Sequence, residues 1–180
     1  MAVRVANPVD RRDGAFMIRI WTVAVLVSLT LAGCGLAVPT DPEGTLEKVT
    51  GGTLRVGVTE SIDDEVTWVR VEQSGADVEP SGIEVDLVRE FASELDATVE
   101  WTEGNERQLA EQLKHGRLDL LIGGFADDTP WMTHGGLTQP YAETTDAFGT
   151  TLKHVMLVPL GENAFLVELD QFLQKAEVTL

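Results

Sequence analysis

Residues 117–131 read RLDLLIGGFADDTPW, a short apolar run that ends in two glycines and opens into a polar loop. The apolar residues 118–122, with one carboxylate near their start, are typical of a strand covered on both faces. Gly123 and Gly124 remove side chains where this strand ends, so a ligand or another backbone segment can approach closely. Because ligands bind outside the carboxyl ends of strands in open α/β sheets, we expect this loop to form the floor of a ligand site. The alternative is that the glycines only permit tight packing of strand against helix.

The polar end of the same loop predicts the start of a helix. Asp127, Asp128 and Thr129 are residue types that cap helices, and Pro130 suits the first helical position. A carboxylate-bearing turn is therefore expected beside the end of the strand.

Outside this stretch, predicted strands alternate with predicted helices. Alternating or short apolar runs predict strands over residues 53–59, 66–71, 97–101 and 154–159. Apolar residues spaced by four predict helices over residues 82–95, 105–114 and 161–173. In the last of these helices the expected buried stripe is Phe165, Leu169, Phe172 and Leu173. This order favours a single doubly wound α/β domain over residues 53–176, followed by a short tail at residues 177–180.

The first 33 residues have the organisation of a signal peptide. Four arginines precede residues 20–32, which are almost wholly apolar, and small residues follow before Cys34. The apolar run is shorter than the about 20 residues that a membrane span needs. Leu31-Ala32-Gly33-Cys34 resembles the lipobox of bacterial lipoproteins, which implies cleavage before Cys34 and lipidation of its sulfur. The alternative is that Cys34 is a small buried apolar residue.

Residues 34–52 link this leader to the predicted domain. They contain several prolines and glycines and show no apolar periodicity, so they predict a flexible tether. The chain has a net charge of −17, and loss of the four arginines and two aspartates of residues 1–33 would take it to −19. A surface of this sign repels nucleic-acid phosphates and anionic lipid headgroups.

Four segments, taken in order, resemble one family. They are GGTLRVGV at residues 51–58, SGIEVDL at residues 81–87, LKHGRLDL at residues 113–120 and LTQPY at residues 137–141. This sequence is similar to the first lobe of bacterial extracellular solute-binding proteins of family 3, the receptors of ABC importers for amino acids and related solutes. The resemblance implies an α/β lobe of the type II periplasmic-binding-protein fold.

The first departure from the family concerns the second lobe. Members of the family cross to a second lobe after the proline-tyrosine turn and return before a strand that resembles residues 155–159. Here only the thirteen residues 142–154 separate Tyr141 from that strand. One βαβ unit takes about 30 residues, so a second α/β lobe does not fit, and a single lobe is expected.

The second departure concerns ligand charge. Amino-acid receptors of the family carry an arginine, in a threonine-x-x-arginine pattern, that pairs with the ligand's carboxylate. In this sequence that position falls on Trp131 or, with a one-residue shift, on Met132. Asp127, Asp128 and the ring of Trp131 would instead favour a cation. The alternative is that one of the aspartates caps the helix and Trp131 packs between sheet and helix.

The candidate ligand-binding residues follow strand ends or carry aromatic rings, and they are Ser61, Trp68, Trp101, Gly124, Phe125, Asp127, Asp128 and Trp131. Trp68 and Trp101 have core packing as their alternative. The three histidines are scattered, and no zinc, phosphate-loop or catalytic-triad pattern occurs, so we expect no metal, no cofactor and no enzymatic activity.

Two hypotheses of function follow. The first is a lipid-anchored, extracytoplasmic solute-binding protein, either the substrate-binding component or an accessory of an ABC-type transport system for a small polar or cationic solute. Its partners would be the solute, a membrane permease or sensor, and the membrane itself through Cys34. It would be exported and anchored to the cell envelope, on the periplasmic side of a membrane in a Gram-negative source. The second is a cell-envelope scaffold or sensor-partner lobe that no longer binds solute.

Overall fold

The computed structural model describes residues 39–62, 66–74, 77–176 and 178, and the predicted leader and Cys34 lie outside this part of the chain. Its centre is a five-stranded sheet with the strand order β5-β1-β6-β10-β7. These strands are β1 (Thr53–Val58), β5 (Thr98–Glu103), β6 (Leu120–Ile122), β7 (Gly135–Leu137) and β10 (Leu157–Pro159). Strand β1 runs parallel to β5 and β6, whereas β10 runs antiparallel to β6 and β7. The carboxyl ends of β1, β5 and β6 therefore lie at one edge of the sheet, where a ligand site is expected.

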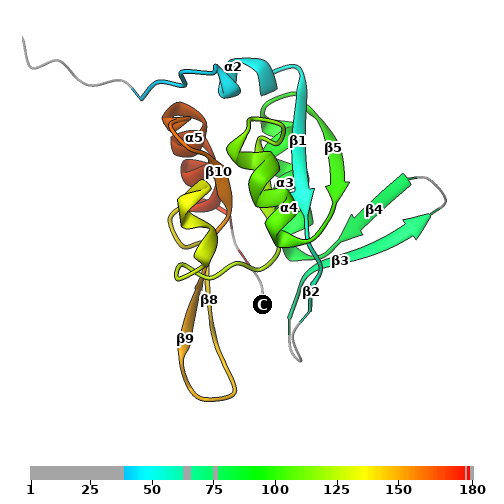
Figure 1. Ribbon diagram of the computed structural model, residues 1–180, viewed down its shortest axis with the longest axis vertical. Coiled ribbons are helices and arrows are strands. Elements are labelled where there is room, and N and C mark those ends of the chain that lie inside the picture. Colours follow the sequence, from blue (N-terminus) through cyan, green and yellow to red (C-terminus); the bar gives the residue numbers. More distant parts are fainter. Residues whose placement is uncertain (1–38, 63–65, 75–76, 177, 179–180) are drawn as a thin grey trace, which may run out of the picture. The chain divides into compact units, whose positions relative to one another are not determined.

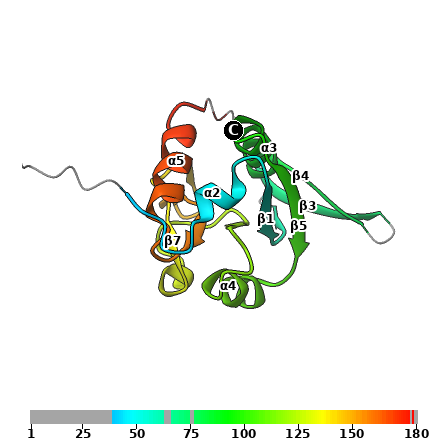
Figure 2. The same cartoon turned by 90° about the horizontal axis from the view of Figure 1, so that it is seen from above.

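Helices cover both faces of this sheet, as predicted for a doubly wound domain (Figure 2). They are α3 (Ile83–Glu94), α4 (Glu106–Lys114) and α5 (Asn163–Leu173). Helices α3 and α5 pack through Phe91, Phe165 and Phe172 in the larger core, which includes the buried stripe predicted for α5. Helix α4 packs through Leu109 and Leu113 in a second core. Asn105 caps α4 as predicted, because its side chain accepts a hydrogen bond from the N–H of Gln108 at 3.0 Å.

Two antiparallel units project from the sheet (Figure 1). One contains β2 (Ser61–Ile62), β3 (Thr67–Ser74) and β4 (Asp77–Ser81). Strand β4 was not predicted, because Pro80 and polar residues made this segment resemble a loop. Proline is tolerated there since β4 is an outer strand of its small sheet.

The second unit is a hairpin of β8 (Ala142–Thr145) and β9 (Thr151–His154). It is formed by the thirteen residues that separate Tyr141 from the last part of the domain. His154, predicted to begin the strand of residues 154–159, is instead the last residue of β9. The structure thus contains one α/β lobe, as predicted, and a hairpin stands where members of the family cross to a second lobe.

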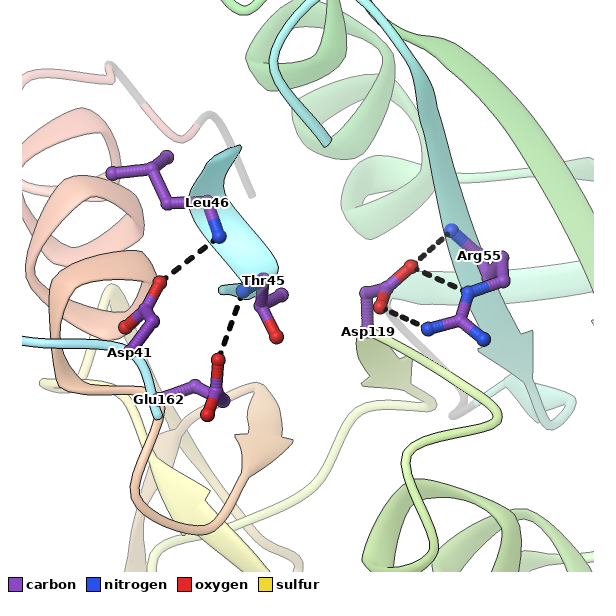
Figure 3. A network of polar contacts seen from close by, with 6 residues as sticks. All are labelled: Asp41, Thr45, Leu46, Arg55, Asp119 and Glu162. Atoms are coloured by element: carbon purple, nitrogen blue, oxygen red, sulfur yellow. Dashed lines mark hydrogen bonds and ion pairs between the residues drawn. The ribbon is translucent and has the colours of Figure 1, made fainter. Parts of the chain in front are cut away.

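The segment before β1 is folded against the domain instead of forming the predicted tether as far as Gly52. It contains α2 (Thr45–Val49), and the side chain of Val49 is completely buried in the larger core. The carboxylate of Asp41 accepts the N–H of Leu46 at 2.9 Å (Figure 3). It also accepts the N–H of Phe165 at 3.1 Å. Residues 41–52 are therefore part of the folded domain.

Glu162, at the start of α5, also binds the segment before β1. Its carboxylate accepts the N–H of Thr45 at 2.9 Å (Figure 3). It also accepts the N–H of Glu43 at 2.9 Å. Burial opposes ionisation of Glu162, but these hydrogen bonds and the charge of Lys48 outweigh it, so the pKa of Glu162 is lowered. Two carboxylates thus satisfy backbone N–H groups at helix N-termini that are far apart in the sequence.

Asp119 joins the first and the central parallel strands. Its carboxylate accepts hydrogen bonds from the backbone N–H and from Nε of Arg55, both at 2.9 Å, and pairs with the guanidinium at 2.5 Å. This hydrogen-bonded pairing raises the pKa of Arg55. The carboxylate at the start of the predicted strand therefore fixes β6 beside β1 (Figure 3).

Candidate ligand site at the carboxyl ends of the parallel strands

A buried carboxylate holds the loop that follows β6. Oε2 of Glu84, in the first turn of α3, accepts the N–H of Gly123 at 2.8 Å and the N–H of Gly124 at 2.9 Å. Oε1 accepts the hydroxyl group of Tyr141, from the turn after β7. Glu84 is completely buried. The end of the central strand, the start of α3 and the segment that leads to the hairpin are therefore joined at one side chain.

Burial and hydrogen bonding act in opposite directions on Glu84. Burial raises its pKa and the hydrogen bonds from Tyr141, Gly124 and Gly123 lower it in part, so that the pKa lies at about 7. Burial, together with the charge and the hydrogen bond of Glu84, raises the pKa of Tyr141 well above its ordinary value. Tyr141 therefore stays a hydrogen-bond donor, whereas Glu84 changes charge close to neutral pH.

The two glycines of the loop are required by close packing. Gly124 has φ 65°, and a Cβ atom added there would lie 2.4 Å from Oγ of Ser61 and 2.9 Å from the ring of Trp68. A Cβ atom on Gly123 would lie 2.2 Å from the side chain of Thr59. Ser61, Trp68 and Gly124 are thus brought together. The glycines thus allow close packing against Thr59, Ser61 and Trp68, which lie on or beside strands, and not against a helix as the alternative had it.

Trp68 lies in the protein interior instead of on an open rim. Only 1% of it is exposed, and its ring stacks on the ring of His154 with the centroids 3.9 Å apart. The rings of Tyr141 and Trp68 lie nearly perpendicular, with their centroids 6.2 Å apart. Nε2 of His154 is hydrogen-bonded to Thr144 at 2.8 Å. The hairpin β8–β9 thus covers Trp68, and a ligand cannot stack on its ring in this arrangement.

Phe125 and Trp131 pack toward α4. Phe125 is buried in the second core, and Trp131 is half-buried against the same cluster. Nε1 of Trp131 donates to the carboxylate of Glu106 at 2.6 Å. Trp131 therefore packs between sheet and helix, as the alternative reading proposed, with one polar contact at the surface.

Asp127 and Asp128 are the members of the predicted set that stay exposed. Thr129 caps the short 3₁₀ helix η1 (Pro130–Thr133), and its hydroxyl accepts the N–H of Trp131 at 3.5 Å. Neither aspartate carboxylate caps it, and among the described residues neither forms a hydrogen bond or an ion pair. The backbone N–H of Asp127 donates to the carbonyl of Lys153 at 2.9 Å, which fixes the loop beside β9.

Trp101 belongs to a different part of the surface. It lines a pocket of about 580 Å³ together with Glu72, Glu79, Pro80, Ser81 and Arg89. The guanidinium of Arg89 lies 5.9 Å from the centre of the indole. Trp101 is thus separated from the loop after β6, and the sequence pattern grouped it there only because it lies near the end of a parallel strand.

Glu84 is the residue of this site that sequence reasoning missed. It was quoted within SGIEVDL for its family pattern, without a role. The available signal was a glutamate in the first turn of a helix beside an apolar face, which does not show that the side chain turns inward. Within the described ranges, no three His, Cys, Asp or Glu side chains gather in a way that would hold a metal ion. No helix in those ranges is long and apolar enough to cross a membrane.

Comparison with known proteins identifies the family. Residues 62–179, about two thirds of the chain, match the bacterial extracellular solute-binding proteins, family 3. This chain belongs to that family. The resemblance to this family is thus confirmed; the match includes the segments at residues 81–87, 113–120 and 137–141, and begins after the segment at residues 51–58.

One curated relative and several solved structures are similar to the chain. A probable ABC transporter arginine-binding protein, ArtJ, from Chlamydia trachomatis is 33% identical over 91 residues, which are 51% of this chain and 33% of the relative. The chain thus matches about a third of that protein's length. The arginine-bound form of domain 1 from TmArgBP has a TM-score of 0.56 and 22% identity, over 72% of this chain and 98% of that domain.

A third similar protein has a different description. The ancestral amino-acid-binding protein AncCDT-1, described as a precursor of cyclohexadienyl dehydratase, has a TM-score of 0.57 and 16% identity. The alignment covers 73% of this chain and 92% of that one. At such identities the solved structures show the fold, and they confirm that this chain forms one lobe of the periplasmic-binding-protein type.

Proposed function

We propose that this chain is a lipid-anchored, extracytoplasmic solute-binding protein, and that it serves an ABC-type transport system for a small cationic solute as substrate-binding component or accessory. The observation that carries the cationic part is the loop after β6. Its exposed side chains include the unpaired carboxylates of Asp127 and Asp128. No arginine occupies this loop, so a ligand carboxylate would lack the partner that it has in amino-acid receptors of the family.

The local chemistry supports this choice of charge. The arginine position falls on Trp131, whose indole is bonded to Glu106, or on Met132, which is 48% exposed. Neither side chain is charged, so neither can form an ion pair with a ligand carboxylate. The net charge of −19 after loss of residues 1–33 would also raise the local concentration of cations.

The relatives support a binding role for one lobe. Domain 1 of TmArgBP is described in an arginine-bound form, so a single lobe of this fold is compatible with a bound cationic amino acid. The curated relative is named as an arginine-binding protein. A lone lobe buries less of its ligand than two lobes do, so we expect dissociation constants on the order of 0.1–1 mM.

Calorimetric titration of the full chain in detergent tests the proposal. The ligands are arginine, agmatine (arginine without its carboxylate) and glutamate, each at low and at high salt. We expect both cations to bind, more weakly at high salt because an exposed site is screened, and glutamate not to bind. Replacing Asp127 and Asp128 by asparagine should weaken cation binding, whereas the charge-matched pair Glu47→Gln/Glu90→Gln on α2 and α3 should not. Tight glutamate binding would refute the charge argument.

A second candidate function has one observation in its favour. Trp68 and Phe125 are buried, Trp131 packs against the second core, and Trp101 lines a separate pocket, so the aromatic residues do not form one concave rim. This arrangement favours a cell-envelope scaffold that has kept the lobe without solute binding. Absence of binding heat with every cation, in a chain that unfolds cooperatively, would support the scaffold.

A further inference from the structure

The carboxylate of Glu84 is an internal anion directly beneath the candidate ligand loop. It uses both oxygens, one for the N–H groups of Gly123 and Gly124 and one for the hydroxyl of Tyr141. These two N–H groups follow the carboxyl end of β6, where a ligand would approach. Because Glu84 already occupies them, they are not available to a ligand's carboxylate.

The loop has little room to move away from Glu84. On its other side Gly123 lies against Thr59, and Gly124 lies against Ser61 and Trp68, so closely that a single added Cβ atom would collide with each neighbour. The loop is thus held between the buried carboxylate of Glu84 on one side and the closely packed residues Thr59, Ser61 and Trp68 on the other. A change at Glu84 would therefore be transmitted to the backbone that leads to Asp127 and Asp128.

We infer that Glu84 is the positioning and specificity-determining residue of this site: its ionised carboxylate fixes Gly123 and Gly124 and supplies a buried counter-charge that favours a cationic ligand over an anionic one. This inference rests on the proposed function. A buried charge is poorly screened, so it acts on a nearby ligand more strongly than exposed carboxylates do. The loss of that charge on protonation should weaken cation binding.

Glu84 ionises in a pH range that experiments on the folded protein can cover. Its pKa of about 7 places the change of charge close to neutral pH, and Tyr141 keeps its proton there because its own pKa is raised. Tyr141 is the titratable group in contact with Glu84. Other titratable or charged groups on the elements around it are Glu60 after β1, Arg70 and Glu72 on β3, Asp86, Arg89, Glu90 and Glu94 on α3, Asp127 and Asp128 on the loop, and Glu143, Lys153 and His154 on the hairpin β8–β9.

The first measurement tests the positioning role without any ligand. In the full chain in detergent, the amide resonances of Gly123 and Gly124 should shift between pH 5.5 and 8.5 as Glu84 ionises. In Glu84→Gln these shifts should disappear, whereas in Glu90→Gln, a matched change at an exposed position of α3, they should persist. Tyr141→Phe removes one hydrogen bond to the carboxylate, so the midpoint should move to higher pH. Equal titration in wild type and Glu84→Gln would overturn the positioning role.

The second measurement tests the counter-charge with arginine and agmatine as probes. The affinity of wild type for both should rise about tenfold from pH 5.5 to 8.5, and by linkage a saturating cation should lower the pKa of Glu84 by about one. Glu84→Gln should keep the weaker affinity at all pH values, and Glu90→Gln should follow wild type. If the amides titrate but the affinities do not change with pH, the counter-charge is refuted and the proposed function stands. If neither cation binds at any pH, the specificity role and the proposed function both fail, and the amide titration still decides the positioning role.

Discussion

Asp41 and Glu162 form reciprocal helix caps: each lies before one helix and accepts N–H groups at the start of the other, although the two helices are more than a hundred residues apart in the sequence. Asp41 accepts N–H groups at the start of α5, and Glu162, at that same start, accepts N–H groups at the start of α2. Each carboxylate thereby satisfies donors that a helix terminus leaves unpaired. This exchange attaches the segment before β1 to the domain.

We expect Asp41→Ala to lower the free energy of unfolding by about 1–2 kcal/mol, the usual cost of losing a helix cap. The substitution should destabilise both α5 and α2, because Asp41 accepts N–H groups at the start of α5 and also the N–H of Leu46 in α2. Urea denaturation of the full chain in detergent measures it. Glu47→Gln, at an exposed position of α2, is the control and should leave the stability unchanged. If the two variants are equally stable, the cap contributes nothing.

Glu84 should make the domain less stable as the pH rises toward neutrality. Its pKa of about 7 in the folded state lies above the ordinary value of 4.5, so the folded state holds the proton more tightly than the unfolded state. The resulting stabilisation is fully present below pH 4.5 and is lost as the pH passes 7. Its size is about 3 kcal/mol, given that one pKa unit corresponds to about 1.4 kcal/mol.

The comparison of wild type with Glu84→Gln isolates this effect, because other groups titrate equally in both. Denaturation at several pH values between 4.5 and 8 should show the difference in unfolding free energy shifting in favour of Glu84→Gln as the pH rises. Glu90→Gln should track wild type. Parallel pH profiles of wild type and Glu84→Gln would contradict the prediction.

Gly124→Ala should be markedly more destabilising than Gly116→Ala. Both glycines have φ 65°, so alanine is disfavoured by the backbone at both positions, by about 1–2 kcal/mol. At Gly116 an added Cβ atom meets nothing within 4 Å, whereas at Gly124 it would lie 2.4 Å from Ser61. The clash should add about 1–3 kcal/mol, as overpacking of a core does. Thermal unfolding of the two variants gives the difference directly, and equal melting temperatures would show that the loop can relax.

Cys34→Ala should prevent attachment of the protein to the membrane. The expectation comes from the apolar run that ends at Leu31-Ala32-Gly33-Cys34. A stable anchor requires two lipid signals, and the lipidation expected at this cysteine would provide them. Detergent phase partitioning checks the prediction: wild type should enter the detergent phase and the variant the aqueous phase. Partitioning of both into the aqueous phase would contradict the lipoprotein assignment.

Local patterns were sufficient for most helices and strands. The stripe of Phe165, Leu169, Phe172 and Leu173 repeats with the period of a helix, so burial of that face follows from residues a few positions apart. Asn105 likewise caps its own helix through a neighbour three residues on. The short distance between Tyr141 and the next strand predicted, by length alone, that no second lobe lies between them.

The roles of single side chains at the site depended on segments distant in the sequence. Glu84 meets Gly123 39 residues later and Tyr141 57 residues later, and Asp41 meets Phe165 124 residues later. No periodicity records such contacts, because they arise only when strand order and helix packing are set. Trp68 was a candidate for ligand binding with core packing as its alternative, and it is buried, since the hairpin β8–β9 lies over it. The pattern of apolar and polar residues along the chain thus determined which helices and strands form and in what order. Packing between distant elements decided which carboxylates are buried and which stay exposed, and therefore which charge the candidate site presents.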